Sequence, residues 1–317
     1  MRDHTIKTRR RTRFFLFITL CTVICIIAGA TVLKRRRVDS RVNIVVATSP
    51  LAIWSFNPSN HSATVMTIPE EMIIQGIHGY GAYSFESLWK LGIIDHRSGL
   101  LLSESTQEEL GIPIVWFIGI DKNQLTPVSD PISWGRHFFS WGNSIRFIIH
   151  AYETNMNIWS FIRLVRLLYQ VSIGRITHID ISHLEVTSSE VLPDGSVRQI
   201  FDNVLLDRAI QGSFEEDSIR GESLTAAVYN TTDTPSLGTR VARLLSNIGI
   251  QVVTVGNEKP TVNQCRILTS VRLLHSNTVE RMKDIYDCKI EIVSSAQRAD
   301  IILRMGTRYA TRFSDVR

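Results

Sequence analysis

The hydrophobic pattern of this chain consists of one long apolar run near the N-terminus and a much longer region of short amphipathic segments. The run extends from Phe14 to Leu33 and contains no charged residue. Its 20 residues can cross the hydrocarbon core of a bilayer as a helix. Lipid offers no hydrogen-bond partner to a bare backbone amide, so an apolar segment is stable there only as a helix. The pattern predicts a membrane-spanning helix at residues 14–33 that follows a basic tail at residues 1–13.

Two alternatives stay open for this run: a buried helix of a soluble domain, and a signal peptide cleaved near Ala28-Gly29-Ala30. Clustered cations flank the run on both sides, namely Lys7, Arg9, Arg10, Arg11 and Arg13 before it and Lys34, Arg35, Arg36 and Arg37 after it. A core helix would carry these charges toward the interior, and cleavage would leave a basic cluster at the mature N-terminus. A bilayer instead places them among the lipid headgroups. With Arg2 and Arg41 included, six cations precede the run and five follow it, which predicts a cytoplasmic N-terminus.

The segments after the run predict an α/β fold in two domains, divided near Glu222 into residues 42–221 and 222–317. In the first domain, three strands in a hairpin-like order are expected at 42–47, 51–56 and 63–68, helices at 85–91 and 105–110, and further strands at 114–120 and 176–181. A helix capped by Thr154 or Asn155 is expected between the last two strands, with an apolar stripe made of Ile158, Phe161, Ile162, Val165 and Leu168. Arg163 and Arg166 are expected on the solvent side of that helix.

The sequence pattern of the second domain predicts the order strand, helix, strand, strand, helix, strand, strand. The expected strands lie at 224–229, 251–255, 266–269, 289–293 and 301–304, and the two helices at 237–248 and 277–286. Gly249 is a permissive residue for ending the first helix, and Asn277 with Glu280 forms a capping-box-like pair at the second. This order favours a small α/β sandwich with both helices on one face of the sheet.

The net charge of +5 is divided unevenly along the chain. Residues 1–41 contain 11 Lys or Arg against Asp3 and Asp39, a net of +9, and the rest contains 24 basic against 28 acidic residues, a net of −4. A nucleic-acid binder must neutralise several phosphates on one surface. The acidic body therefore argues against nucleic acid as a partner, and the basic residues belong to the membrane flanks.

Two of the four cysteines, Cys21 and Cys25, lie in the apolar run, where a thiol behaves as a small hydrophobe. Cys265 and Cys288 each precede an expected strand, and one helix joins those strands, so the strands are expected to be parallel. If they are neighbours, their first residues lie roughly 5 Å apart, within the range of a disulfide. Two cysteines make a poor zinc site. We expect a Cys265–Cys288 disulfide, with two separate thiols as the alternative.

The C-terminal block resembles the LytR C-terminal domain family. The residues that carry the resemblance are Ala227-Val-Tyr-Asn-Thr-Thr232, Pro235, Leu237-Gly238, the helix that ends at Gly249, Val252-Val-Thr-Val-Gly-Asn257 and Ala299-Asp-Ile-Ile-Leu-Arg-Met-Gly306. The family usually has a strand ending in Asn-Gly-Thr, and here Thr231 replaces the glycine. The order of these elements across the block is more specific than any one of them.

The preceding block resembles a divergent LytR-CpsA-Psr domain. The resemblance rests on Ser55-Phe-Asn-Pro58, Val65-Met-Thr-Ile-Pro-Glu-Glu71, Leu110-Gly-Ile-Pro-Ile-Val-Trp-Phe117, Thr154-Asn-Met-Asn-Ile-Trp159 and Leu192-Pro-Asp-Gly195. It implies a single-pass protein of the cytoplasmic membrane with extracytoplasmic domains. In family members that are enzymes, it also implies transfer of a glycopolymer from a polyprenyl-diphosphate carrier to the cell wall, with guanidinium groups on the diphosphate and carboxylates on Mg²⁺.

The chain departs from that pattern where the family motif has Arg and Asp, because Glu70 and Glu71 stand there. A glutamate in place of the arginine would repel phosphate. The nearest later cations are Arg136, Arg146, Arg163 and Arg166, and no Arg-rich catalytic segment is recognisable. Glu71 could still hold a metal, but one carboxylate without partners is a weak site, so no resident metal is expected unless the chain is a transferase, which would use Mg²⁺.

Other catalytic motifs are missing from the sequence, although His78 and His96 flank a Gly-Tyr-Gly81 loop that could lie near a pocket. The first hypothesis is a non-catalytic, envelope-facing pseudoenzyme that binds a lipid-linked glycan or cell-wall polymer, or acts as a scaffold. The second hypothesis is the glycopolymer phosphotransferase. Transcriptional attenuation ranks last, because the N-terminal tail is too short to fold around DNA.

Overall fold

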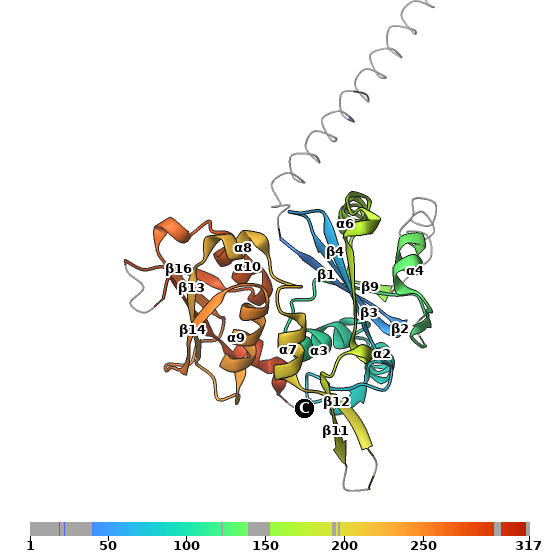
Figure 1. The fold of residues 1–317 in the computed structure, drawn as a ribbon. Helices are drawn as coiled ribbons and strands as arrows, with labels where there is room; N and C mark the ends of the chain where they lie inside the picture. Colours follow the sequence, from blue (N-terminus) through green and yellow to red (C-terminus); the bar gives the residue numbers. More distant parts are fainter. Residues whose placement is uncertain are drawn as a thin grey trace, which may run out of the picture. The chain divides into compact units, whose positions relative to one another are not determined.

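The computed structural model describes residues 40–121, 123–138, 153–191, 195, 197–294 and 299–314, together with Thr19 and Thr22 (Figure 1). The predicted membrane helix at residues 14–33 lies outside the described residues except for Thr19 and Thr22, which are both helical. In the part of the chain that is described, no helix has the length and apolar character needed to cross a bilayer. Residues 40–317 form one compact unit.

The first domain is built on a six-stranded mixed sheet with the strand order β10-β4-β3-β1-β7-β9. Its strands are β1 (Val42–Val46), β2 (Thr48–Ser49), β3 (Leu51–Asn57), β4 (Ser62–Ile68), β5 (Ile73–Gln75), β6 (Ala82–Ser84), β7 (Trp116–Gly119), β8 (Thr126–Pro127), β9 (Glu153–Thr154), β10 (Ile176–Asp180), β11 (Thr187–Val191) and β12 (Val197–Phe201). Its helices are α2 (Phe85–Ile94), α3 (Leu100–Leu110), α4 (Pro131–Phe138), α6 (Ile158–Gln170), α7 (Asn203–Ile210) and α8 (Asp217–Glu222). The predicted hairpin order is confirmed, because β1 pairs antiparallel with β3 and β3 with β4.

Both faces of this sheet are covered, which explains why its central strands read as continuous apolar runs. Along β1, Val45 points into a core shared with α2, α3 and α7, whereas Ile44 and Val46 point into a second core shared with α6. Two tryptophans fix how close the layers come. A Cβ atom at Gly119 would lie 2.0 Å from the Trp89 ring, and one at Gly135 would lie 2.2 Å from the Trp54 ring. Only glycine leaves room for these rings.

The predictions for α6 were partly wrong. The side chain of Asn157 caps the helix, two or three residues later than the expected Asn155 or Thr154. The buried residues of α6 are Phe161, Leu164, Val165 and Leu167, whereas Ile158 and Ile162 of the predicted apolar stripe are exposed. The reason is that this helix carries apolar residues around most of its circumference, so periodicity alone could not select the face that packs on the sheet.

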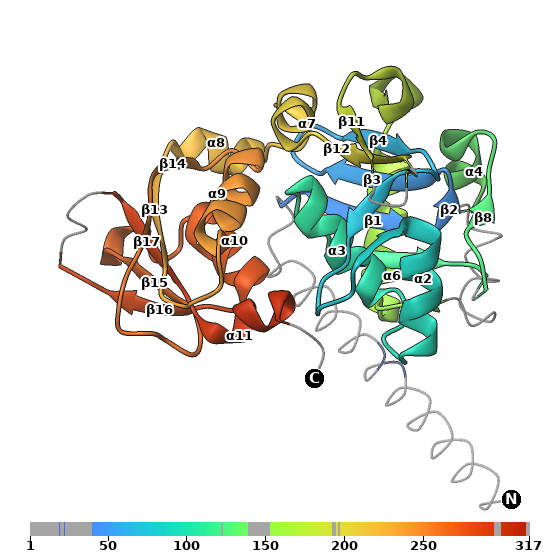
Figure 2. The same cartoon turned by 90° about the horizontal axis from the view of Figure 1, so that it is seen from below.

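The second domain has the predicted order of elements. Its sheet has the order β14-β13-β17-β15-β16, in which only β15 and β17 pair antiparallel. The elements are β13 (Thr225–Asn230), α9 (Leu237–Asn247), β14 (Gln251–Asn257), β15 (Arg266–Thr269), α10 (Asn277–Tyr286), β16 (Lys289–Ile292), β17 (Ile301–Met305) and α11 (Thr307–Ala310). Helices α9 and α10 lie on one face of the sheet and share one apolar core with it (Figure 2).

The predicted disulfide is present between Cys265 and Cys288, with the two Cα atoms 4.7 Å apart. Strands β15 and β16 are parallel neighbours, and Arg266 pairs with Lys289, so the two cysteines stand side by side at the start of both strands. Both sulfur atoms lie in the apolar core of the domain. The disulfide therefore forms for the predicted reason, which is that the two cysteines precede parallel neighbouring strands.

A buried ion-pair cluster connects the start of β1 to the second domain. Glu216 lies just before α8, with its Oε1 2.7 Å from Nε of Arg281 on α10. The backbone amide of Arg41 donates to Oε2 of Glu216 (3.4 Å), and Arg281 donates to the Arg41 carbonyl oxygen (3.1 Å). Arg41 itself is buried. This arginine, counted among the membrane-flanking cations in the sequence, instead holds the two domains together.

Helix α8 belongs with the second core, although it lies before the predicted boundary. Ile219 of α8 packs in the core of the second domain. The carboxylate of Glu222 accepts hydrogen bonds from the backbone amides of Asn277 (2.6 Å) and Thr278 (2.9 Å) at the first turn of α10. The boundary near Glu222 stays a prediction, but the structure places the packing of the second domain a few residues earlier.

Candidate functional site

The residues at the predicted motif position, Glu70 and Glu71, lie in the turn between β4 and β5, and both side chains are exposed. Within the described ranges, no ion pair is formed by either carboxylate. The same ranges contain no group of three or more His, Cys, Asp or Glu side chains arranged to hold a metal ion.

The candidate arginines and histidines do not converge on that position. Arg136 and Arg166 are exposed, Arg163 is partly buried on α6, and Arg146 lies outside the described residues. His96 is exposed, whereas His78 contacts the C-terminal end of the chain. The His78 amide donates to the Arg312 carbonyl oxygen (2.5 Å), and its Nε2 lies 3.3 Å from Oε2 of Glu104. The loop near His78 is thus part of the contact between the domains.

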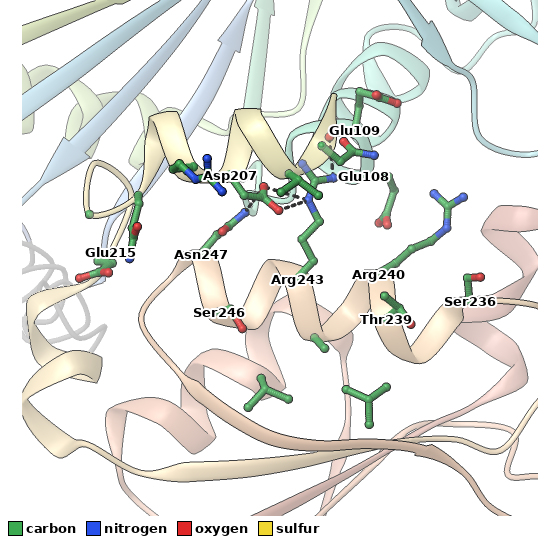
Figure 3. A pocket seen from close by; sticks show the side chains of 18 residues that line it. Glu108, Glu109, Asp207, Glu215, Ser236, Thr239, Arg240, Arg243, Ser246 and Asn247 are labelled. Carbon is green, nitrogen blue, oxygen red and sulfur yellow. Dashed lines mark hydrogen bonds and ion pairs between the residues drawn. The ribbon is translucent and has the colours of Figure 1, made fainter. Parts of the chain in front are cut away.

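A cleft of about 780 Å³ lined by polar and charged side chains lies between the end of α3, α7 and α9 (Figure 3). Helix α9 buries Val241, Leu244 and Leu245 in the core of its own domain. Its opposite face presents Arg240, Arg243 and Asn247, which are three and four residues apart. Such residues are neighbours on a helix surface, so they form one polar stripe along the wall of the cleft.

Arg243 fixes the distance between the walls of the cleft. Its Nε lies 2.9 Å and 2.7 Å from the two carboxylate oxygens of Asp207 on α7, and its Nη1 donates to the Glu109 carbonyl oxygen at the end of α3 (2.8 Å). Asn247 donates to the Gly111 carbonyl oxygen (3.1 Å) and to Asp207 (3.1 Å). These bonds, most of them charge-assisted, join three helices, so Arg243 and Asp207 act as structural supports of the cleft.

Arg240 is the cation of the α9 stripe that stays open to a ligand. Its guanidinium carbon lies 5.1 Å from the centroid of the Phe313 ring, a cation–π contact at the exposed surface. The same residue lines an adjoining cavity of about 270 Å³, and Glu108 and Glu109 line both cavities. Ser236 and Thr239 lie beside it with exposed side chains. Figure 3 shows Arg240 directed away from the Arg243–Asp207 support.

The floor of the two cavities contains a buried carboxyl group. Burial raises the pKa of Glu108, although the Tyr309 hydroxyl and Arg312 act in the opposite direction. Tyr309 Oη donates to Oε1 of Glu108 (2.5 Å), and Nη1 of Arg312 lies 3.8 Å from the same oxygen. Burial also raises the pKa of Tyr309, and the neighbouring Glu108 raises it further. The pKa of Glu109, on the rim, is raised by burial as well.

The sequence did not predict this cleft. Only Arg240, Arg243 and Asn247 carried a signal, since they form a polar stripe opposite the predicted apolar face of the helix at 237–248. The partners of Arg243 and Asn247 on α3 lie 134 and 136 residues away along the chain. Spacing within one helix cannot reveal contacts over that separation.

Comparison with known proteins identifies the second domain. Residues 223–309 match the family model described as LytR cell envelope-related transcriptional attenuator, which confirms the resemblance expected for the C-terminal block. The match covers less than half of the chain, so it assigns this domain to the LytR C-terminal family and says nothing of the residues before it. No curated protein sequence matches the chain.

Solved structures similar to this chain cover about half of it and most of their own length. The transcriptional regulator yvhJ of Bacillus subtilis is 13% identical, with a TM-score of 0.38 over 54% of this chain and 94% of that one. TagV of Bacillus subtilis is 12% identical, with a TM-score of 0.38 over 54% and 93%. The LytR-CPS2A-psr family protein YwtF (TagT), with bound octaprenyl pyrophosphate lipid, is 10% identical, with a TM-score of 0.35 over 54% and 88%.

Proposed function

We propose that this chain is a membrane-anchored, envelope-facing protein that binds a cell-wall glycan in the cleft between α3, α7 and α9, without transferring it. The cleft carries the proposal, because its lining combines closely spaced donors and acceptors with apolar surface. Its charged residues are three arginines and four carboxyl groups: Arg208, Arg240, Arg243, Glu108, Glu109, Asp207 and Glu215. Such a nearly balanced set does not favour a polyanion, which needs an excess of cations.

A hydroxyl-rich sugar fits this lining better than a phosphate chain does. Sugar hydroxyls both donate and accept hydrogen bonds, so they can use Arg240 as donor and Glu215 or Glu109 as acceptor. The C–H faces of sugar rings can lie on the apolar part of the lining, which consists of Val204, Ala242, Val252 and Val255. The volume of about 780 Å³ is within the range of small-ligand sites. We infer that the cleft holds a short stretch of polymer.

Two observations support binding rather than phosphoryl transfer. Glu70 and Glu71 occupy the place where the family resemblance implies Arg and Asp, and both are exposed without a described ion pair. Phosphoryl transfer requires cations to neutralise charge that develops on the phosphate oxygens. The transferase remains the second candidate, and it differs from the binding protein by needing Mg²⁺ and a polyprenyl diphosphate.

The proposed location follows from three features. The sequence of residues 14–33 is that of a membrane helix with basic flanks. The Cys265–Cys288 disulfide fits an oxidising compartment outside the cytoplasmic membrane. The family of the second domain is described by its relation to the cell envelope.

Thermal unfolding of the full chain in detergent separates these candidates, because a ligand that binds only the folded state raises the melting temperature. A rise with soluble peptidoglycan oligosaccharides alone supports the proposal. A rise that requires Mg²⁺ together with a short polyprenyl diphosphate, with none from the oligosaccharides, would establish the transferase instead.

A further inference from the structure

Helix α6 exposes an unusual amount of apolar surface on its outer face. Ile158 is 45% exposed, Trp159 56% and Ile162 41%. These three residues lie within five positions at the start of the helix, and Tyr169, two turns further along, is 56% exposed. Single exposed apolar residues are ordinary, but a contiguous apolar face on one helix marks a surface for a partner or a membrane.

The inner face of α6 is already used, so the outer face is not part of the domain core. Phe161, Leu164 and Val165 belong to the same apolar core as Val42 and Ile44 of β1, on that side of the sheet. With 100° between successive residues, Ile158, Ile162 and Tyr169 project on one side of the helix and Leu164 on the other. Arg166 lies on the outer face among them and is exposed. Apolar residues, a tryptophan and a cation on one helical face are typical of helices that lie in a membrane interface.

The length of the connecting chain places this helix within reach of a bilayer. The predicted span ends at Leu33 and the compact unit begins at Ser40, seven residue steps later. An extended chain covers at most about 25 Å in seven steps. Helix α6 has 13 residues and is roughly 20 Å long.

The helix also ends on the side of the sheet where β1 begins. Residue Arg175, which follows α6, donates to the Asn60 carbonyl oxygen in the turn between β3 and β4 (2.9 Å). That turn stands beside the start of β1, because Val42 pairs with Phe56. Figure 1 shows α6 beside this end of the sheet. The compact unit can therefore lie with α6 against the bilayer while its first residue stays attached to the anchor.

We propose that the outer face of α6, formed by Ile158, Trp159, Ile162 and Arg166, docks on the anionic surface of the bilayer that holds the anchor. The inference rests on the proposed membrane anchoring. The cations at residues 34–37 and Arg166 match the negative charge of such a surface. Docking would hold the compact unit in a fixed orientation, with Trp159 at the level of the headgroups.

The test uses the full chain reconstituted in vesicles of phosphatidylglycerol and phosphatidylcholine with brominated acyl chains, which quench a tryptophan that enters the membrane interface. The chain has six tryptophans, so the signal of Trp159 is obtained as the difference between the native chain and Trp159→Phe. The proposal predicts that this Trp159 fluorescence is at least twofold weaker in brominated than in unbrominated vesicles. Ile162→Glu should abolish the difference, and Val271→Glu, an equally drastic change at a residue that is 68% exposed on the second domain, should leave it intact.

Equal quenching of the native chain and Trp159→Phe would overturn the docking. Cross-linking that traps a dimer sensitive to Ile162→Glu, without quenching, would assign the face to a second copy and would also overturn it. Extraction of the same vesicles with alkaline carbonate reports on the anchor separately. A chain released by carbonate would refute the proposed anchoring, whereas a retained chain without Trp159 quenching would refute only the docking.

Discussion

The hydroxyl of Tyr309 donates a hydrogen bond of 2.5 Å to Oε1 of Glu108, and this bond joins α11 of the second domain to α3 of the first. Both side chains are buried. In Tyr309→Phe the carboxyl group keeps its burial and loses its shortest hydrogen bond, while the longer one from Gln107 remains, and such a loss typically costs about 1–3 kcal/mol. Urea unfolding of the full chain should show that loss. Tyr83→Phe, at a residue that is 41% exposed, is the matched control and should change the free energy of unfolding little.

Glu108 should also make stability depend on pH. Burial raises its pKa above the value of about 4.3 that a glutamate has in an unfolded chain. In the folded state the carboxyl group therefore keeps its proton to higher pH than in the unfolded state. Its contribution to stability is fully present below the unfolded pKa and is lost as pH rises through the folded pKa.

The variant Glu108→Gln removes this titration. The free energy of unfolding of the native chain should fall relative to that of Glu108→Gln as pH increases from about 4 to 8. The pKa values of Glu109 and Glu216, also raised by burial, are common to both proteins and cancel in the difference. A difference that stays constant over this range would show that Glu108 does not titrate as described.

The pair Glu216–Arg281 should be essential to the folded state. Both side chains are at most 7% exposed, and Arg41 shares the same carboxylate. Glu216→Gln leaves the buried Arg281 guanidinium without its counter-charge, and breaking a buried pair in this way costs about 3–5 kcal/mol. The neighbouring change Glu215→Gln breaks only a contact with Arg220, whose side chain is 73% exposed, and should cost about 1 kcal/mol or less. Equal losses in the two variants would contradict the assignment.

The Cys265–Cys288 disulfide closes a short loop in the second domain. The sequence separation is 23 residues, for which the loss of chain entropy in the unfolded state corresponds to about 3 kcal/mol. Replacing both cysteines by serine should lower the free energy of unfolding by roughly that amount. Replacing Cys21 and Cys25 should not alter the unfolding of residues 40–317. A chain whose unfolding is insensitive to the first pair would show that the bond does not form in solution.

The order of elements in the second domain followed directly from the sequence, because turn residues there separate short apolar segments with strand or helix spacing. The same reasoning located the disulfide, since two parallel strands joined by one helix bring Cys265 and Cys288 together. It failed at α6, where Ile158 and Ile162 were expected inside and lie outside. An apolar residue on an outer face is indistinguishable in sequence from one in a core.

The polar cleft could not be predicted from the sequence, for a different reason. Its supports, Asp207 and Arg243, belong to helices of different domains, and their contact depends on how those domains pack. Glu70 and Glu71 were selected as candidate site residues because they stand at the position of a family motif. In the structure these two carboxylates are exposed, and the convergent polar groups lie elsewhere.

Calorimetric titration of the full chain with a soluble peptidoglycan oligosaccharide tests the proposed function most directly. The comparison needs Arg240→Ala, which removes the open cation that α9 contributes to the cleft, and Arg272→Ala, an exposed arginine of the second domain outside it. We predict binding by the native chain and by Arg272→Ala, with affinity reduced at least tenfold in Arg240→Ala. Equal affinity in all three proteins, or no binding by the native chain, would contradict a glycan site in this cleft.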